Sequence, residues 1–128
     1  MGVRILGLFF LLLFFSNSGF SQTPKVDSLM TLINSSRGVE QLTHKNQLTE
    51  AFLVNNASKT HELSEEVLAT NAIDQASALT AKSRYLKARA LTILGDYELA
   101  YPLFDTAQKT FDDLEDKSGI ALCHLGRG

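Results

Sequence analysis

Apolar residues recur every three to four positions from Thr23 onward, with polar residues between them. This period places the apolar side chains on one face of an α-helix, whereas a strand requires strict alternation. Runs of β-branched residues are absent here, and the only prolines are Pro24 and Pro102. The pattern predicts an all-α fold. We expect a short helix after Pro24, a helix over about 40–53, one between a break at 55–58 and Ala72, and helices over 75–94, 96–114 and 118–128.

The first 22 residues follow a different pattern. A short segment with one positive charge, at residues 1–4, precedes an unbroken apolar run over 5–15 and a small polar stretch over 16–22. This layout is typical of a secretory signal peptide, so we expect residues 1–21 to be removed before Gln22 and the protein to be periplasmic or secreted. A membrane anchor is the alternative, but an apolar helix of this length spans only about 16 Å, roughly half of a hydrocarbon core.

Charge and cysteine content exclude some classes of function. The formal net charge is −2, and removal of the segment that contains Arg4 changes it to −3. No cluster of basic residues is present that could attract nucleic acid or an anionic membrane surface. Cys123 is the only cysteine, so an exported form has no internal disulfide and depends on helix packing for its stability.

Two of the predicted helices have recognisable ends. Asp74 is a suitable N-cap for the helix over 75–94, and Gly95 suits the left-handed position that ends this helix. Asp96 can then cap the next helix, where its carboxylate also meets the positive end of the helix dipole. Pro102 lies early in that second helix, and the apolar pattern continues through it, so we expect at most a slight kink.

The same region resembles a tetratricopeptide repeat (TPR), a helix-turn-helix unit of about 34 residues. The turn Gly95-Asp96-Tyr97 matches the turn of the family, and a small, an aromatic and a small residue follow on one face of the second helix. Arg84 and Lys87 depart from the family pattern, which has a bulky aromatic residue and a leucine there. The positions that carry the resemblance are Ala88, Leu91, Gly95, Tyr97, Ala100, Phe104, Ala107, Leu125 and Gly126.

The resemblance implies antiparallel helix hairpins stacked as a short TPR-like α-solenoid. A lead-in segment with a short helix occupies 22–38, and the repeats occupy 39–128 as a degenerate unit (39–73), a clear unit (75–115) and an incomplete unit (117–128). Ala88 and Gly126 occupy the same position in consecutive units, which gives a period of 38 residues. In the degenerate unit, either Val67 or Ala69 occupies the second small position. A generic array of helical hairpins is the alternative, with the same paired helices.

The resemblance also implies a peptide-binding groove along the first helix of the clear unit. The groove-facing positions are Lys82, Tyr85, Arg89, Thr92 and Ile93. Lys82, Tyr85 and Arg89 recur at intervals of three and four residues, so they form one stripe, in which two cations flank an aromatic ring. Such a stripe can bind a carboxylate-bearing or extended peptide. The alternative is a solvated face with Tyr85 packed on a neighbouring helix.

We expect no catalytic, cofactor-binding or metal-binding residues within this sequence, and therefore no enzyme activity. The separations of His44, His61 and His124 fit no metal-ligand spacing, and no second cysteine accompanies them. Cys123 and His124 are adjacent, but neighbours on a helix point about 100° apart. Cys123 is therefore expected to be a small buried residue rather than half of a catalytic dyad.

The most direct functional hypothesis is an exported protein–protein interaction module. Its layout is similar to the N-terminal periplasmic sensor region of bacterial TPR-containing signalling proteins of the histidine kinase or cyclase type. The last apolar stripe, at Ile120, Leu122 and Leu125, lacks a second helix, so we expect a longer protein whose only membrane contact is a downstream transmembrane helix. The alternatives are a free-standing secreted scaffold protein and the accessory domain of an exported enzyme. In each case the expected partner is a protein or peptide.

Overall fold

The computed structural model describes residues 24–70, 74 and 77–128, and it is all-α over these ranges, as predicted. The predicted signal peptide at 1–21 lies outside the described residues. No strand occurs in the described ranges, and none of their helices is long and apolar enough to cross a membrane. The six helices are α2 (Pro24–Ser35), α3 (Gly38–Phe52), α4 (Ala57–Leu68), α5 (Ala78–Ile93), α6 (Tyr97–Asp113) and α7 (Lys117–Arg127).

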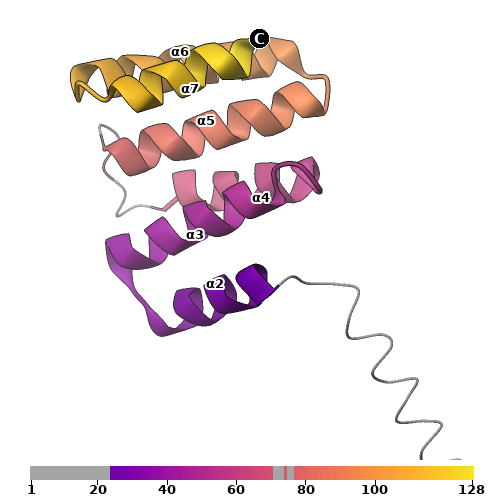
Figure 1. Ribbon diagram of the computed structural model, residues 1–128, viewed down its shortest axis with the longest axis vertical. Helices are drawn as coiled ribbons and strands as arrows, with labels where there is room; N and C mark the ends of the chain where they lie inside the picture. Colours follow the sequence, from indigo (N-terminus) through magenta and orange to yellow (C-terminus); the bar gives the residue numbers. More distant parts are fainter. Residues whose placement is uncertain (1–23, 71–73, 75–76) are drawn as a thin grey trace, which may run out of the picture.

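The helices follow one another along the long axis of the molecule (Figure 1). Each of them packs on its neighbour in the sequence, from α2 on α3 to α6 on α7. In addition α3 contacts α5 and α5 contacts α7, so α5 touches four other helices. This central position makes α5 the main packing element of the described chain.

The largest part of the core surrounds α5 and consists of small residues and a few large rings. The alanines at 81, 88 and 90 of α5 and at 100 and 107 of α6 are fully buried. Alanine has no side chain beyond Cβ, so two helices that meet through alanines approach each other closely. Phe104 and Leu86 are also fully buried and fill the remaining space. At about 25 cal/mol per Å² of apolar surface, this burial stabilises the α5–α6 pair more than helix propensity alone does.

The α5–α6 turn has the geometry expected from Gly95. The amide of Gly95 donates to the carbonyl of Thr92 (3.1 Å), and the amide of Asp96 donates to that of Leu91 (2.8 Å). These two bonds form a Schellman motif, which requires the residue after the C-cap to be left-handed. Gly95 has φ +87°, which glycine adopts without strain.

The α6–α7 turn repeats this motif without a glycine. The amide of Glu115 donates to the carbonyl of Asp112 (3.0 Å), and the amide of Asp116 donates to that of Phe111 (2.8 Å). Glu115 therefore occupies the position of Gly95, with φ +57°. Because a side chain in this region crowds the following carbonyl, the turn carries strain that the α5–α6 turn avoids.

One predicted N-cap is wrong, and the other is confirmed in position but not in its side-chain hydrogen bond. The helix predicted over 75–94 begins at Ala78, because Ser77 and not Asp74 is its N-cap; the Ser77 hydroxyl accepts from the amide of Thr80 (3.2 Å). The carbonyl of Asp74 instead accepts from the amide of Ser77 (3.1 Å), which forms a turn before the helix. Asp96 does lie at the N-cap position of α6, but its side chain makes no capping hydrogen bond.

Two predicted apolar positions face solvent. Tyr97 is 52% exposed, and its ring lies beside that of Tyr101 on α6, at 6.3 Å between ring centroids. Leu125 is 76% exposed, because α7 packs through the face that contains Gly119, Cys123 and Gly126. Pro102 does not interrupt α6, which continues to Asp113.

The degenerate unit buries polar side chains where the clear unit buries apolar ones. Thr49 of α3 and Thr60 and Ser64 of α4 are fully buried, and the Thr60 hydroxyl donates to the Thr49 carbonyl (3.0 Å). Val67 is also fully buried, whereas Ala69 is exposed, so Val67 is the residue that packs into the core. The hydroxyls remain acceptable in the core because they have carbonyl partners.

Glycines in α7 let this helix lie directly on phenylalanine rings of α6. A Cβ at Gly126 would be 2.6 Å from Cε1 of Phe104, and a Cβ at Gly119 would be closer still to the ring of Phe111. Both rings are buried, so neither can move aside easily. The docking of α7 therefore depends on the absence of side chains at these two positions.

We expect Glu115→Gly to stabilise the protein by about 1 kcal/mol, because it removes the strain of a left-handed non-glycine residue. This change corresponds to a rise of roughly 4–8 °C in the melting temperature of a domain of this size. Gly95→Ala is the matched control and is expected to lower the melting temperature by a comparable amount. A melting temperature that does not rise for Glu115→Gly contradicts the assignment of strain.

Gly126→Ala is expected to destabilise the docking of α7 by roughly 1–3 kcal/mol through overpacking against Phe104. Truncation of that ring by Phe104→Leu creates space, so the cost of Gly126→Ala should fall in the Phe104→Leu background. Denaturant unfolding of the two single variants and the double variant measures this coupling. Additive effects of the two substitutions would contradict the close contact.

Candidate functional site

The five residues predicted to line a groove all lie on α5 or at its end, and three of them form one contact group. The Lys82 Nζ lies 5.4 Å from the centroid of the Tyr85 ring, and the Arg89 Cζ lies 6.0 Å from it. Both distances are within the range of a cation–π interaction. The two others are separate: the Thr92 hydroxyl donates to the carbonyl of Ala88 (2.9 Å), and Ile93 is half exposed at the end of the helix.

Tyr85 is a core residue with a polar tip. Its side chain is 4% exposed, and its ring makes an edge contact with Phe104 of α6, at 6.2 Å between centroids. Its hydroxyl accepts a hydrogen bond from Nη1 of Arg89 (3.0 Å). The ring therefore holds α5 against α6 and orients Arg89, while the two cations form the accessible part of the stripe.

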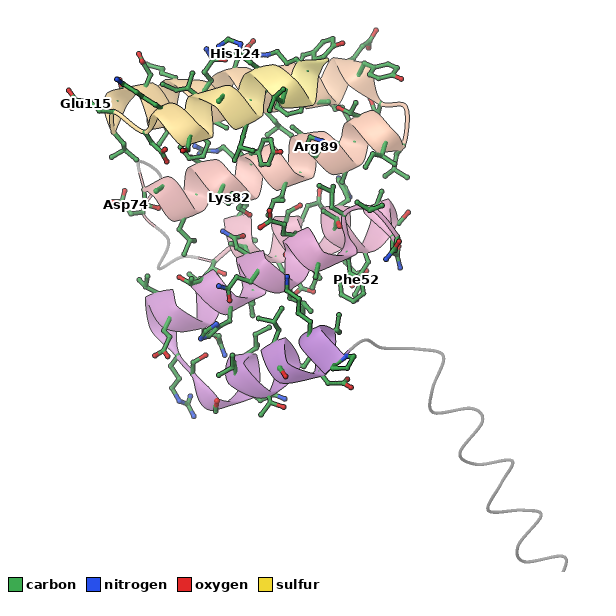
Figure 2. The ribbon with its side chains drawn as sticks, viewed as in Figure 1. Phe52, Asp74, Lys82, Arg89, Glu115 and His124 are labelled. Carbon is green, nitrogen blue, oxygen red and sulfur yellow. The ribbon has the colours of Figure 1, made fainter. Side chains whose placement is uncertain are left out.

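Lys82 connects this stripe to α3. Its Nζ lies 3.4 Å from Oε1 of Glu50, and both side chains are partly exposed. Figure 2 shows Lys82 on the α5 segment above α3. An ion pair that is open to solvent contributes little to stability, typically less than about 1 kcal/mol. Its importance is positional, because it places opposite charges at the rim of the space between the two helices.

A cavity of about 320 Å³ lies between α3 and α5. Its volume is within the range of small-ligand pockets. A second hollow of about 420 Å³ lies between α2 and α3 and shares Gln47 and Glu50 with the first. The residues around the first cavity, which we name the α3–α5 pocket, are Thr43, Asn46, Gln47, Glu50, Ala78, Leu79 and Lys82.

Asn46 is the most unusual residue of the α3–α5 pocket. Its side chain is 6% exposed, and its Nδ2 donates to the carbonyl of Leu79 on α5 (3.0 Å). Its Oδ1 is buried and has no hydrogen-bond partner among the described residues. A buried acceptor without a partner costs roughly 1–3 kcal/mol, so its presence beside a pocket requires a physical reason.

A hollow of about 450 Å³ between α6 and α7 is lined by polar side chains, which are Asp105, Gln108, Lys109, Asp112 and Arg127. Among the described residues, no group of three or more histidine, cysteine, aspartate or glutamate side chains could hold a metal ion. Cys123 is fully buried, as predicted, and burial raises the pKa of its thiol, with an opposing and smaller effect from Arg127. A buried thiol with a raised pKa is a poor nucleophile at neutral pH. Arg127 itself binds Asp105 and Gln108 of α6.

The α3 wall of the pocket was not anticipated from the sequence. Thr43, Asn46, Gln47 and Glu50 recur at intervals of three, one and three residues, so they share one face of α3. A polar stripe of this kind normally indicates a solvated face, and only the contact of α3 with α5 distinguishes the two cases. The sequence therefore shows the polar stripe of α3, but it does not show that α5 covers this stripe.

Tyr85→Phe is expected to destabilise the protein by about 1 kcal/mol, because it removes the acceptor of the Arg89 hydrogen bond from a buried position. Tyr101→Phe is the matched control at an exposed ring and should leave stability unchanged. Denaturant unfolding at neutral pH measures both variants. Equal stability of Tyr85→Phe and the wild type would show that the hydroxyl bond is not formed in solution.

The α3–α5 pocket thus combines an apolar part of its wall, formed by Ala78 and Leu79, with a pair of opposite charges, Lys82 and Glu50, at its rim. The chain matches no protein-family model, no curated protein and no solved structure.

Proposed function

We propose that this protein is an exported TPR-type interaction module that binds a protein or peptide along α3 and α5. The observation on which this proposal depends is the α3–α5 pocket, of about 320 Å³, which is lined by Lys82 of the α5 stripe. A concave surface with a few polar groups is the usual form of a binding site. The two helices present side chains from separate parts of the sequence, which is how stacked repeats form extended binding surfaces.

A regular spacing of buried residues supports the repeat architecture. In each helix from α3 to α7, three buried residues recur at intervals of four and three. Matching positions lie 39 residues apart between α3 and α5 and 38 apart between α5 and α7, close to the period expected from the sequence. The five triplets are Leu42, Asn46 and Thr49; Thr60, Ser64 and Val67; Ala81, Tyr85 and Ala88; Ala100, Phe104 and Ala107; and Gly119, Cys123 and Gly126.

We further propose that the module is a short α-solenoid, exported by residues 1–21 and used as the sensor or scaffold part of a membrane signal-transduction protein. The support for export is the apolar run over 5–15 and its small polar flank. The support for the sensor role is the layout of the sequence. Both parts of this proposal can be tested separately from the binding surface.

Site-specific photo-crosslinking tests the binding surface. A photoreactive phenylalanine analogue at Gln47 or at Ile93 lies on the proposed surface, whereas the same analogue at Val54 lies at the exposed α3–α4 turn. Expression with the leader in the native host allows capture of the natural partner. We expect the same crosslinked partner from Gln47 and Ile93 and none from Val54.

Charge variants test whether the cations of α5 contribute to the crosslinked contact. Arg89→Glu reverses one accessible cation of the stripe and is expected to reduce the crosslinking yield at Ile93 several-fold, since rim charges mainly affect association. Lys109→Glu, on the exposed face of α6, is the matched control. An equal crosslinking yield from Val54, or a yield at Ile93 that Arg89→Glu leaves unchanged, would exclude this surface as the binding site.

A further inference from the structure

We infer that the α3–α5 pocket and the neighbouring hollow between α2 and α3 bind one extended peptide segment, which places an apolar side chain in the pocket and an acidic side chain in the hollow. This inference rests on the proposed binding function and specifies the chemistry of the partner. We name the second space the α2–α3 hollow. Its lining residues are Lys25, Ser28, Leu29, Gln47 and Glu50.

The two spaces adjoin each other across α3. The α3–α5 pocket has a volume of about 320 Å³ and the α2–α3 hollow one of about 420 Å³, and Gln47 and Glu50 line both of them. Helix α3 contacts both α2 and α5, and it lies between them in Figure 1. A ligand that fills both spaces therefore runs across α3, from α2 to α5.

The α2–α3 hollow presents hydrogen-bond donors that have no acceptor among the described residues. The Lys25 ammonium forms no ion pair there, and the Ser28 hydroxyl forms no hydrogen bond. The Oε1 of Gln47 accepts a hydrogen bond from Nδ1 of His44 (3.1 Å), so the N–H donors of the same amide group are left for a ligand. An ionised carboxylate only accepts hydrogen bonds, and its bond to a charged donor such as Lys25 is stronger than a neutral one.

The charges of the two linings also favour an acidic group. Glu50 is the acidic residue that lines both spaces, and its Oε1 lies 3.4 Å from Nζ of Lys82, which compensates its charge. Lys25 then leaves an excess of one positive charge. Because Lys25 is exposed to solvent, we expect its contribution to the affinity to be modest, about fivefold.

The α3–α5 pocket is suited to the apolar side chain. Ala78 and Leu79 form an apolar part of its wall on α5. A leucine side chain that enters this space removes its own surface and part of theirs from water, which provides the larger share of the affinity. The pocket and the hollow therefore differ in the side chain that each of them favours.

The distance between the two spaces predicts the spacing of the two side chains in the ligand. The axes of packed helices lie about 8–10 Å apart, so spaces on either side of one helix are roughly 9 Å apart. An extended chain of the polyproline II type has three residues per turn and rises about 3.1 Å per residue, so residues i and i+3 lie on one side about 9 Å apart. We therefore expect the acidic and the apolar residue to be three positions apart.

NMR titration of the isotope-labelled chain with defined peptides tests this inference. The reference probes are acetylated and amidated Gly-Glu-Pro-Pro-Leu-Gly and its reverse order, Gly-Leu-Pro-Pro-Glu-Gly, because the spacing does not fix the direction of the chain. We expect the tighter of the two to shift the amide signals of Ser28, Gln47 and Leu79. Replacement of its glutamate by glutamine should weaken binding about fivefold, and replacement of its leucine by serine at least tenfold.

Peptides with one proline or three prolines between the two residues test the spacing, and each should bind at least fivefold more weakly than the reference. They keep the charge and the apolar side chain of the reference peptide. The loss of affinity therefore reports only whether both side chains reach their spaces together.

Three protein variants assign the contacts. Lys25→Ala should make the glutamate and glutamine peptides bind equally, whereas Lys117→Ala, an exposed lysine in the first turn of α7, should keep the fivefold difference. Ala78→Phe fills the pocket from an exposed position of α5 and should reduce binding of the reference peptide to the level of the serine peptide. The peptide series on the wild-type protein keeps the test valid if a variant fails to fold.

Each outcome decides a separate question. Equal binding of the glutamate and glutamine peptides, an affinity that does not depend on the spacing, or a fivefold difference that survives Lys25→Ala would overturn the inference. Shifts confined to Arg89, Thr92 and Ile93 would overturn it and leave the proposed function standing. The proposed function itself fails only if the crosslinking experiment finds no partner on this surface.

Discussion

The close approach of α5 to the helices on both sides of it is the contact on which the rest of the fold depends. Ala81, Ala88 and Ala90 are fully buried, so the backbone of α5 lies near its neighbours and large rings fill only the gaps. A larger residue at any of these positions has no free space to enter, since protein interiors are close-packed. The same geometry recurs at α7, where Gly119 and Gly126 rest on rings of α6. Helix separation is thus set by small residues at regular intervals.

The α3–α4 and α5–α6 hairpins bury residues at the same spacing, but the buried side chains differ in chemistry. Around α5 and α6 the buried triplets are alanine, tyrosine and phenylalanine, whereas α4 uses Thr60, Ser64 and Val67. The hydroxyls have backbone partners, for example the carbonyl of Thr49 for Thr60. They bury less apolar surface than the residues they replace, so the α3–α4 hairpin gains less from the hydrophobic effect. This difference explains why the sequence of the first unit matches the repeat pattern weakly although its buried positions follow the same spacing.

The sequence predicted the helices well and the surface details less well, for identifiable physical reasons. The period of apolar residues and the left-handed Gly95 depend on local properties, so the six helices and the α5–α6 turn could be predicted. Ser77 and Asp74 are both good N-cap residues, so local sequence alone did not show that α5 begins after Ser77. The exposure of Tyr97 and the buried state of Tyr85 depend on which face a neighbouring helix covers. A polar residue such as Asn46 gives no sign in the sequence that it is buried.

Asn46 carries a stability cost at the central triplet position of α3. Leucine or alanine would fill this position without an unpaired acceptor, and the equivalent positions hold Tyr85, whose hydroxyl is bonded, and Cys123, whose thiol is a weak acceptor. An unpaired buried acceptor weakens the core by roughly 1–3 kcal/mol. Asn46 offsets part of this cost through its Nδ2, which donates to the carbonyl of Leu79 and so joins α3 to α5 beside the α3–α5 pocket. The same side chain therefore weakens the packing of α3 and orders the contact between α3 and α5.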